Sequence, residues 1–426
     1  MSLDKHDSRS GMQEEQLNQL NTLAKALRGR NPFHDERLKN LPNKLRDVHD
    51  WSEMVPFTLR ADYQQDQQEH PPYGSNWTAE AEAVLLSTTS GTSTQPIFWR
   101  DDKEGMKWLA GNWKKVYQAA GLKTSDVAMF AWSFGPQLME WTAIDAARRF
   151  GMMCLPVGSI NTVGRLKMII DCRVSVLFCT PSYALRLGEI AREENIDLSQ
   201  SCLRRIIVGG EPGGSITATR QRIEKVWPGA RVLDTYCLTE TGPVAYPCPV
   251  NADTLHILSD SFYAEVVAPE SDNKMQPGFV GELILTTLGR HASPALRFRT
   301  GDLVKRGPRA QCSCGSFDLA LEGGIIGRLD NLVYVRGISV YPSAVEELIR
   351  RHPQVLEYRV EVKSRRSMTE MAVKLELVAG TDKPQKIAKT LALEMQTAFG
   401  LKIPVEILPE GSLERGESSA RRWHRL

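Results

Sequence analysis

Residues 85–102 read LLSTTSGTSTQPIFWRDD, and this stretch is where the fold begins to be decided. An apolar run ends at Leu86, every residue from Ser87 to Thr94 is Ser, Thr or Gly, and the chain then becomes apolar and aromatic again. Such a segment is either an ordinary polar turn or a phosphate-binding loop, in which backbone N–H groups and hydroxyls converge on an anion. It is not a P-loop, because no G-x-x-x-x-G-K-[ST] is present. The stretch alone leaves both interpretations open.

The pattern on either side of this loop predicts the fold class. From about Ala81 onward strands alternate with helices, which predicts an α/β large domain with mainly parallel sheets covered by helices. From Phe262 strands follow one another, as in an antiparallel sheet or a small β-barrel-like subdomain. A β-α-β tail predicts a small, mobile α+β C-terminal domain. We expect a flexible leader at 1–12, a large domain at 13–329 and the small domain at 330–426.

Composition excludes some classes of protein. A chain of 426 residues is expected to form two or three folding units. A net charge of +2 favours neither nucleic acid nor an anionic membrane as partner. No apolar run is long enough to span a membrane, and residues 1–12 lack the apolar core of a signal peptide. Eight cysteines without such a signal indicate thiols or metal ligands in a reducing compartment, so we expect a cytoplasmic protein.

Four further motifs follow the hydroxyl-rich loop. They are VGGEPGG at 208–214, LDTYCLTETG at 233–242, LRFRTGDLV at 296–304 and GRLDNLVYVRG at 327–337. Each is common by itself, but all of them in this order resemble the adenylate-forming superfamily of acyl-CoA ligases. The chain length and the segments NPFHDERL and PFTLRADY resemble the short branch typified by phenylacetate-CoA ligase. The resemblance extends from about residue 13 to the end of the chain.

This resemblance implies an ATP site. The phosphate loop would contain Thr89, Ser90, Gly91 and Thr92, and one wall of the adenine slot would contain Gly210, Glu211 and Pro212. Tyr236 would stack on adenine, Asp234 would accept a hydrogen bond from its amino group, and Asp302 would accept from both ribose hydroxyls.

The resemblance also assigns catalytic roles. Thr239 would contact the α-phosphate, and Glu240 would hold Mg²⁺, a cation that prefers oxygen ligands. Arg328 would lie near the ribose and phosphate, and Asp330 would be the hinge about which the C-terminal domain turns between adenylation and thiol transfer. The alternative for each of these residues is an ordinary turn, ion-pair or core role.

A second set of residues predicts a metal site. Its members are Cys248, His256, Cys312 and Cys314, the last two forming a C-x-C pair. Three thiolates and one imidazole suit structural Zn²⁺ in a closed tetrahedral site. The resemblance supports this interpretation, and the alternative is four unrelated buried residues.

The segment FAWSFGP at 130–136 predicts the acyl pocket. Trp132, Phe134 and Gly135 would make an apolar, flat-walled pocket, and Cys237 would narrow it. We therefore expect an aromatic or heteroaromatic carboxylic acid as substrate, such as phenylacetate, benzoate or a substituted relative. Ordinary core packing is the alternative for these aromatic residues.

Two positions depart from the family pattern. Gln95 stands where the family has Lys at the end of the phosphate loop. In the tail, LERGESSARRWHRL, Ser419 occupies the place of the catalytic Lys. A hydroxyl offers no charge where negative charge develops, so adenylation is expected to be impaired unless Arg415, Arg421 or Arg422 replaces it.

Three functions remain open. The first is an aryl-CoA ligase that uses ATP, Mg²⁺ and CoA. The second is an acyltransferase that moves an aryl group from CoA to an acyl carrier protein without ATP, which the Ser419 substitution favours. The third is a non-catalytic homologue that binds nucleotide, against which the retained Glu240, Asp302 and Arg328 argue. A homodimer is compatible with the sequence.

Overall fold

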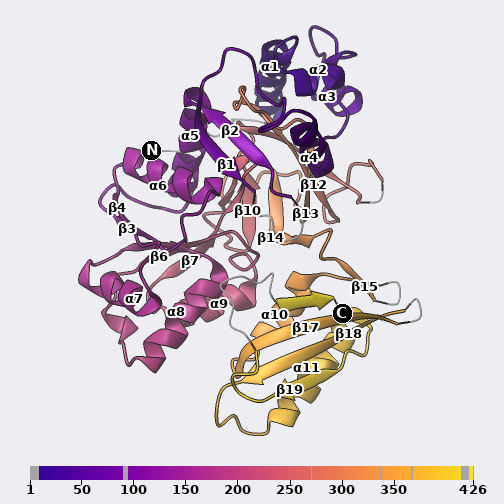
Figure 1. Cartoon of the computed structure of the whole chain (residues 1–426). Coiled ribbons are helices and arrows are strands. Elements are labelled where there is room, and N and C mark those ends of the chain that lie inside the picture. The colour runs from indigo at the N-terminus through magenta and orange to yellow at the C-terminus, as the bar shows by residue number, and fades with distance from the viewer. Residues whose placement is uncertain are drawn as a thin grey trace.

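A computed structural model describes residues 9–89, 95–269, 271–335, 338–365, 368–413 and 422–425. The chain forms a large N-terminal part and a smaller C-terminal part, drawn in orange and yellow in Figure 1. None of the described helices is both long enough and apolar enough to cross a membrane.

The chain begins with four helices and a hairpin. They are α1 (Arg9–Leu27), α2 (Pro32–Leu38), α3 (Val48–Met54), α4 (Arg60–Glu69), β1 (Ala83–Thr88) and β2 (Phe98–Asp102). A flexible leader was predicted at 1–12, but residues 9–12 belong to α1, which begins at Arg9 and buries Met12, so the predicted boundary is wrong. Residues 1–8 lie outside the described part. The β1 and β2 strands pair antiparallel and flank the hydroxyl-rich loop, whose residues 90–94 are also outside the described part.

A five-stranded parallel sheet follows, as predicted. Its order is β4 (Met153–Pro156), β3 (Val127–Phe130), β5 (Val176–Cys179), β6 (Arg205–Val208) and β7 (Arg231–Asp234). The surrounding helices are α5 (Lys103–Ala119), α6 (Leu138–Phe150), α7 (Thr162–Asp171), α8 (Pro181–Glu193) and α9 (Thr217–Val226), with a 3₁₀ turn at Leu198–Gln200. Alternate strand residues enter two cores: Ile206 packs with α7, α8 and α9, whereas Ile207 packs with α5 and α6.

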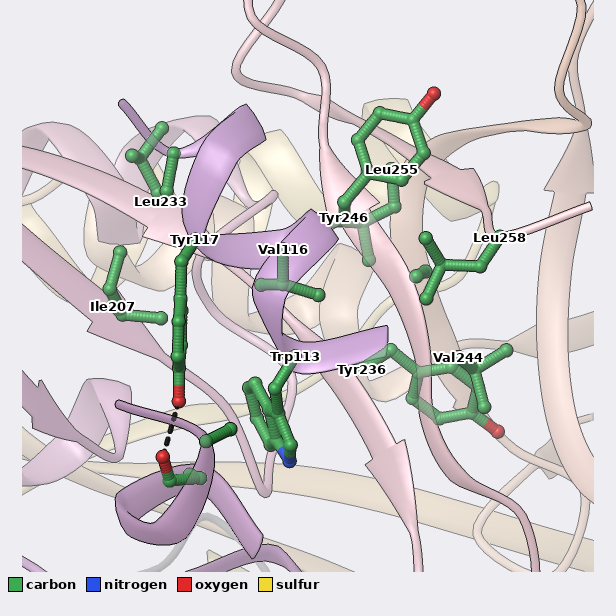
Figure 2. Packing of buried hydrophobic residues seen from close by; sticks show 14 of the residues in the cluster. Trp113, Val116, Tyr117, Ile207, Leu233, Tyr236, Val244, Tyr246, Leu255 and Leu258 are labelled. Carbon is green, nitrogen blue, oxygen red and sulfur yellow. Dashed lines mark hydrogen bonds between the residues drawn. The ribbon is translucent and has the colours of Figure 1, made fainter. Parts of the chain in front are cut away.

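The later strands form a seven-stranded antiparallel sheet. Its order is β11 (Phe262–Val267), β12 (Val280–Thr287), β13 (Phe298–Arg306), β14 (Ala320–Arg328), β10 (Thr254–Ile257), β9 (Gly242–Pro247) and β8 (Tyr236–Leu238). Helices α5 and α6 lie between the two sheets and share one core with them. In Figure 2 the Tyr117 hydroxyl of α5 donates to the Ala143 carbonyl oxygen at 2.5 Å, while Trp113 and Val116 extend from the same helix.

The C-terminal part has its own core. It contains β15 (Val333–Val335), β16 (Ile338–Val340), α10 (Pro342–Arg350), β17 (Val355–Arg365), β18 (Met368–Leu377), α11 (Pro384–Phe399), β19 (Val405–Leu408) and β20 (Trp423–Arg425). The main sheet has the order β19-β18-β17-β20, and the short β20 strand was not predicted. The predicted α/β fold with a small α+β C-terminal domain is therefore confirmed.

Polar contacts hold the two parts against each other. Arg422 Nη1 donates to Ser182 Oγ at 3.0 Å, Ala218 N–H donates to Glu347 Oε2 at 2.9 Å, and Arg222 Nη2 donates to the Val355 carbonyl oxygen at 2.6 Å. These contacts place α10 and the C-terminal tail beside α8 and α9 (Figure 1).

Candidate active site

An arginine contacts Thr89, the residue at which the predicted phosphate loop begins. Arg60, the first residue of α4, donates from Nη2 to Thr89 Oγ1 at 2.8 Å and from Nη1 to Glu240 Oε1 at 3.0 Å. Thr89 also accepts the Ile97 N–H at 2.9 Å, which closes the base of the loop. The predicted phosphate loop and the predicted magnesium ligand are thus neighbours, although a long sequence separates them. Ser90, Gly91 and Thr92 lie outside the described residues.

A buried ion pair fixes the turn that carries Thr239 and Glu240. Arg290 binds Asp101 through two hydrogen bonds of 2.6 and 2.5 Å, and both side chains are almost fully buried. The remaining Arg290 nitrogen, Nη1, donates to the Thr239 carbonyl oxygen at 2.9 Å. Thr239 Oγ1 in turn lies 3.4 Å from the Thr88 carbonyl oxygen. The pair therefore holds the turn against the end of β1.

A second chain of contacts joins three of the motifs. The Tyr236 hydroxyl donates to Asp302 Oδ2 at 2.5 Å, and Arg328 Nη1 donates to Asp302 Oδ1 at 3.3 Å. Arg328 Nε donates to Asp330 Oδ1 at 2.9 Å. Gly301 has a φ of +73°, and a Cβ there would lie 3.0 Å from Arg328 Nη2, so a side chain at this position would disturb the arginine.

Burial controls the titration of Asp302. Removal from water raises its pKa to about 6, although Arg328 and the Tyr236 hydroxyl favour the charged form. The negative charges of Asp330 and Glu240 contribute to this raised pKa, and Glu240 lies on the turn after β8, the strand whose Tyr236 bonds Asp302. The ribose, hinge and magnesium residues predicted from separate motifs therefore form one cluster.

The predicted adenine wall lies beside the C-terminal part. Glu211 Oε1 accepts the Ser182 N–H at 2.7 Å, and Ser182 Oγ accepts from Arg422. Asp234 accepts the N–H groups of Ser215 and Thr235 at 2.9 and 3.0 Å, and burial raises its pKa to about 6. Gly210 has a φ of +85°, in the left-handed region that favours glycine. Pro212 belongs to the same turn. Tyr236, predicted to stack on adenine, is buried with the core in Figure 2.

The predicted acyl-pocket residues lie at two depths. Trp132 is buried against Phe130 and Phe178, and its indole N–H finds no hydrogen-bond acceptor in the described part of the chain. Phe134 is only half-buried and contacts Trp141 edge-on, with ring centroids 5.3 Å apart. The Gly135 carbonyl oxygen accepts from the Trp141 indole at 2.8 Å. Cys237 lies on β8, and burial is the main cause of the raised pKa of its thiol.

The four predicted zinc ligands converge. Their ligand atoms all lie within 4.8 Å of one another. Cys248 Sγ is 3.8 Å from Cys312 Sγ, and Cys314 Sγ is 3.5 Å from His256 Nε2. These separations agree with the edges of a tetrahedron around zinc, roughly 3.5–3.8 Å for Zn–S bonds of about 2.3 Å. His256 Nδ1 lies 3.4 Å from the Asp318 carbonyl oxygen, which leaves Nε2 facing the thiols. The four residues therefore fit a zinc ion.

Of the two positions that depart from the family pattern, the structure describes Gln95 but not Ser419. Gln95 faces α4, where its carbonyl and side-chain oxygens accept from Gln64 and Gln68 at 2.7 and 3.0 Å. Ser419, Arg415 and Arg421 lie outside the described residues. Arg422 is buried and binds Glu357 at 2.8 Å as well as Ser182, so its guanidinium is already engaged.

A cavity of about 310 Å³ lies elsewhere, between α1 and the sheet edge at β11. Arg9, Met12, Tyr263 and Arg306 are among its lining residues. None of the predicted nucleotide, acyl or metal residues lines it, so it is separate from the candidate active site.

Comparisons with known proteins agree with this geometry. Residues 337–424 match the family described as AMP-binding enzyme C-terminal domain. A phenylacetate-coenzyme A ligase of Thermus thermophilus is 28% identical, over 96% of this chain and 95% of that protein. The enzyme of the same description from Escherichia coli is 29% identical, over 89% of this chain and 86% of that protein.

Solved structures show the same fold. A 2-hydroxyisobutyryl-CoA ligase in its postadenylation state superposes with a TM-score of 0.92 at 23% identity, covering 99% of this chain and 91% of that chain. In its thioesterification state the same ligase superposes with a TM-score of 0.71 at 22% identity, covering 99% of this chain and 91% of that chain. The fold is that of the adenylate-forming enzymes. The predicted resemblance to them, and to the phenylacetate-CoA ligases among them, is confirmed.

Three important residues were missed by sequence reasoning. Arg60, Asp101 and Arg290 were given no role, yet they hold Thr89, Glu240 and the Thr239 turn. The only signal for Arg60 was its place in the PFTLRADY segment. Nothing in the sequence paired Asp101 with Arg290, which lie 189 positions apart.

Proposed function

We propose that this protein activates an aromatic carboxylic acid with ATP and Mg²⁺ and then transfers the acyl group to CoA. In the first step a carboxylate oxygen attacks the α-phosphorus, the bond to the bridging oxygen breaks, and pyrophosphate leaves. In the second step the CoA thiol attacks the acyl carbon, loses its proton, and AMP leaves. The similarity to phenylacetate-coenzyme A ligases over most of the chain supports this reaction.

The observation that carries the proposal is the cluster of Glu240, Asp302 and Arg328. A folded domain gains little from burying Asp302 near a second carboxylate, because that negative charge raises the cost of ionising Asp302. Arg60 links Glu240 to Thr89, and Tyr236 links the strand before Glu240 to Asp302, an arrangement that suits a nucleotide with its metal ion. Glu240 would hold Mg²⁺ once Arg60 releases it, and Mg²⁺ would neutralise the phosphate charge.

The test is acid-dependent exchange between ATP and pyrophosphate, followed by detection of the CoA thioester. A panel of phenylacetates and benzoates should support exchange, and addition of CoA should convert the active acids to thioesters. Absence of both exchange and thioester with every acid would reject the ligase reaction.

We predict that binding of the nucleoside depends on pH through Asp302. The ionised carboxylate accepts from ribose hydroxyls, and with a pKa of about 6 it becomes protonated as the pH falls below that value. Adenosine, which carries no phosphate to titrate, should bind about tenfold more weakly at pH 5 than at pH 7.5. Calorimetric titration would measure this difference.

Two controls isolate the carboxylate. Asp302→Asn should remove most of the pH dependence, and 2′-deoxyadenosine should show a smaller dependence than adenosine. An affinity that does not change with pH in the wild-type protein would contradict the role given to Asp302.

We also propose that Cys248, His256, Cys312 and Cys314 bind one structural Zn²⁺. Four protein ligands leave no position for water, so the ion would stabilise the loop at 307–319 rather than take part in the reaction. Elemental analysis should find about one zinc ion per chain. Cys312→Ser should lower that content and the free energy of unfolding.

The matched control for zinc is Cys172→Ser, because Cys172 is exposed and distant in sequence from the cluster. Its zinc content should equal that of the wild-type protein. A stable, metal-free wild-type protein would contradict the zinc assignment.

One observation favours a second candidate function. The resemblance puts Ser419 in the place of the family's catalytic Lys, and Arg422 is held by Glu357 and Ser182. If no other cation replaces the Lys, the protein would instead transfer an aryl group from CoA to a carrier-protein thiol without ATP. Incubation of aryl-CoA with a phosphopantetheinylated carrier, with ATP omitted, would reveal that transfer.

A further inference from the structure

The first turn of α6 lies where the predicted parts of the active site meet. The Pro136 carbonyl oxygen, just before this helix, accepts the Thr88 N–H at 2.8 Å at the start of the phosphate loop. Met139 faces the adenine wall, since a Cβ placed on Gly210 would lie 3.6 Å from its terminal carbon. The helix also packs against β8, which leads to Thr239 and Glu240. A side chain on this turn is therefore well placed to contact the substrate.

Glu140 stands on that turn, and one of its oxygens has no hydrogen-bond partner among the residues that the structure describes. The residue is only 9% exposed, and Oε2 is shielded from solvent without a hydrogen bond. Burial raises the pKa of Glu140, opposed only by its own backbone N–H, and no cationic side chain of the described residues offsets the burial. An unpaired buried carboxyl group destabilises a fold, so its presence calls for a partner.

The predicted acyl pocket is next to this carboxyl group. Helix α6, which carries Glu140, packs against β8, which carries Cys237, and Phe134, Met139 and Cys237 pack against the same core. Burial raises the pKa of the Cys237 thiol most, and the Glu140 carboxylate raises it as well. The buried indole N–H of Trp132 is a second polar group for which the described ranges of the chain supply no hydrogen-bond partner. An apolar pocket with an unpaired acceptor on one side differs from the plain aromatic pocket expected from the sequence.

We propose that Glu140 determines substrate specificity and that the activated acid carries a hydrogen-bond donor, an amino or hydroxyl group, on its apolar body. This inference rests on the proposed function, because it concerns the acid bound at the same site. The donor would pair with Oε2 and remove the cost of the buried, unpaired oxygen. An acid without the donor would leave Oε2 unpaired in a dry pocket, which is how polar sites reject apolar analogues.

The test uses benzoates that differ in one substituent. Hydroxy-, amino- and aminomethyl-benzoates, at the meta and para positions, are compared with the methoxy analogues and with benzoate. For each acid, kcat/KM is measured by exchange between ATP and pyrophosphate, and affinity is measured separately by calorimetry. The wild-type protein should prefer at least one donor-bearing acid over its methoxy or unsubstituted analogue by about tenfold or more.

Variants identify the residue responsible. Glu140→Leu should abolish the preference, and Glu140→Gln should retain binding of a hydroxyl group but lose any advantage of the cationic aminomethyl group. The matched control is Glu104→Gln, since Glu104 occupies the first turn of α5 but is exposed. Its selectivity should equal that of the wild-type protein. Glu140→Gln keeps the test valid if the Leu variant does not fold.

The outcomes separate this inference from the proposed function. Exchange with all acids alike, or a preference that survives in Glu140→Leu, would overturn the role of Glu140 and leave the ligase reaction intact. If binding of the acids is selective and depends on Glu140 but no exchange between ATP and pyrophosphate occurs, the role of Glu140 in specificity is supported and adenylation is rejected. Neither binding nor exchange with any acid would overturn both.

Discussion

Replacing Glu240 with Gln is expected to lower acid-dependent exchange between ATP and pyrophosphate by about 100- to 1000-fold. The substitution keeps the size of the side chain but removes the charge that would hold Mg²⁺. Glu240 is buried, and its partner Arg60 would remain without a counter-ion, which further disfavours a nearby divalent cation. Exchange rates measured over a range of Mg²⁺ concentrations would show both a lower maximum and a weaker dependence on the metal.

The control for this prediction is Glu322→Gln. Glu322 forms a surface ion pair with Lys305 at 2.7 Å and lies outside the cluster, so its loss should leave exchange unchanged. Thermal unfolding of both variants would report whether the fold is retained. A Glu240→Gln protein with exchange within about threefold of wild type would remove Glu240 from the metal site.

Replacing Ser419 with Lys is expected to raise the rate of adenylation by about 100-fold. In the family that this chain resembles, a Lys at this place binds the carboxylate and the α-phosphate, where negative charge develops. Arg422, one of the residues considered as a replacement, is buried and pairs with Glu357, so it is not available without breaking that pair. The measurement is exchange with the best acid of the panel, in wild type and variant side by side.

Ser412→Lys is the matched control, because it adds the same charge to an exposed position earlier in the tail. It should not change exchange. A Ser419→Lys protein no faster than wild type would mean that another group already supplies the charge. No exchange in wild type but recovery in the variant would indicate that the chain has lost the first half-reaction, which favours the acyltransferase.

Much of the fold could be predicted because local patterns carry it. Helix α6, one of the helices in the predicted alternation, ends at Phe150 and is followed by Gly151 at a φ of +101°, the left-handed conformation that favours glycine at a helix end. The strand at β6 places Ile206 and Ile207 in opposite cores, as the alternation of side chains requires. The start of α1 was misplaced, because the polar residues before Met12 give no sign that one face of the helix is covered.

By itself, then, the sequence determined the class of fold, the order of the motifs and the chemical types of the candidate residues. The class of fold follows from patterns among residues that are close in sequence. The motifs and their candidate residues follow from a resemblance in which the motifs keep the same order along the chain. The tertiary structure alone decided which side chains meet. Arg60 with Glu240, Arg290 with Asp101, and the unpaired oxygen of Glu140 arise from elements far apart in the chain. The protonation state of each side chain and the partner it binds depend on how deeply it is buried and on what lies near it in space. Neither property can be determined from the residue type at one position.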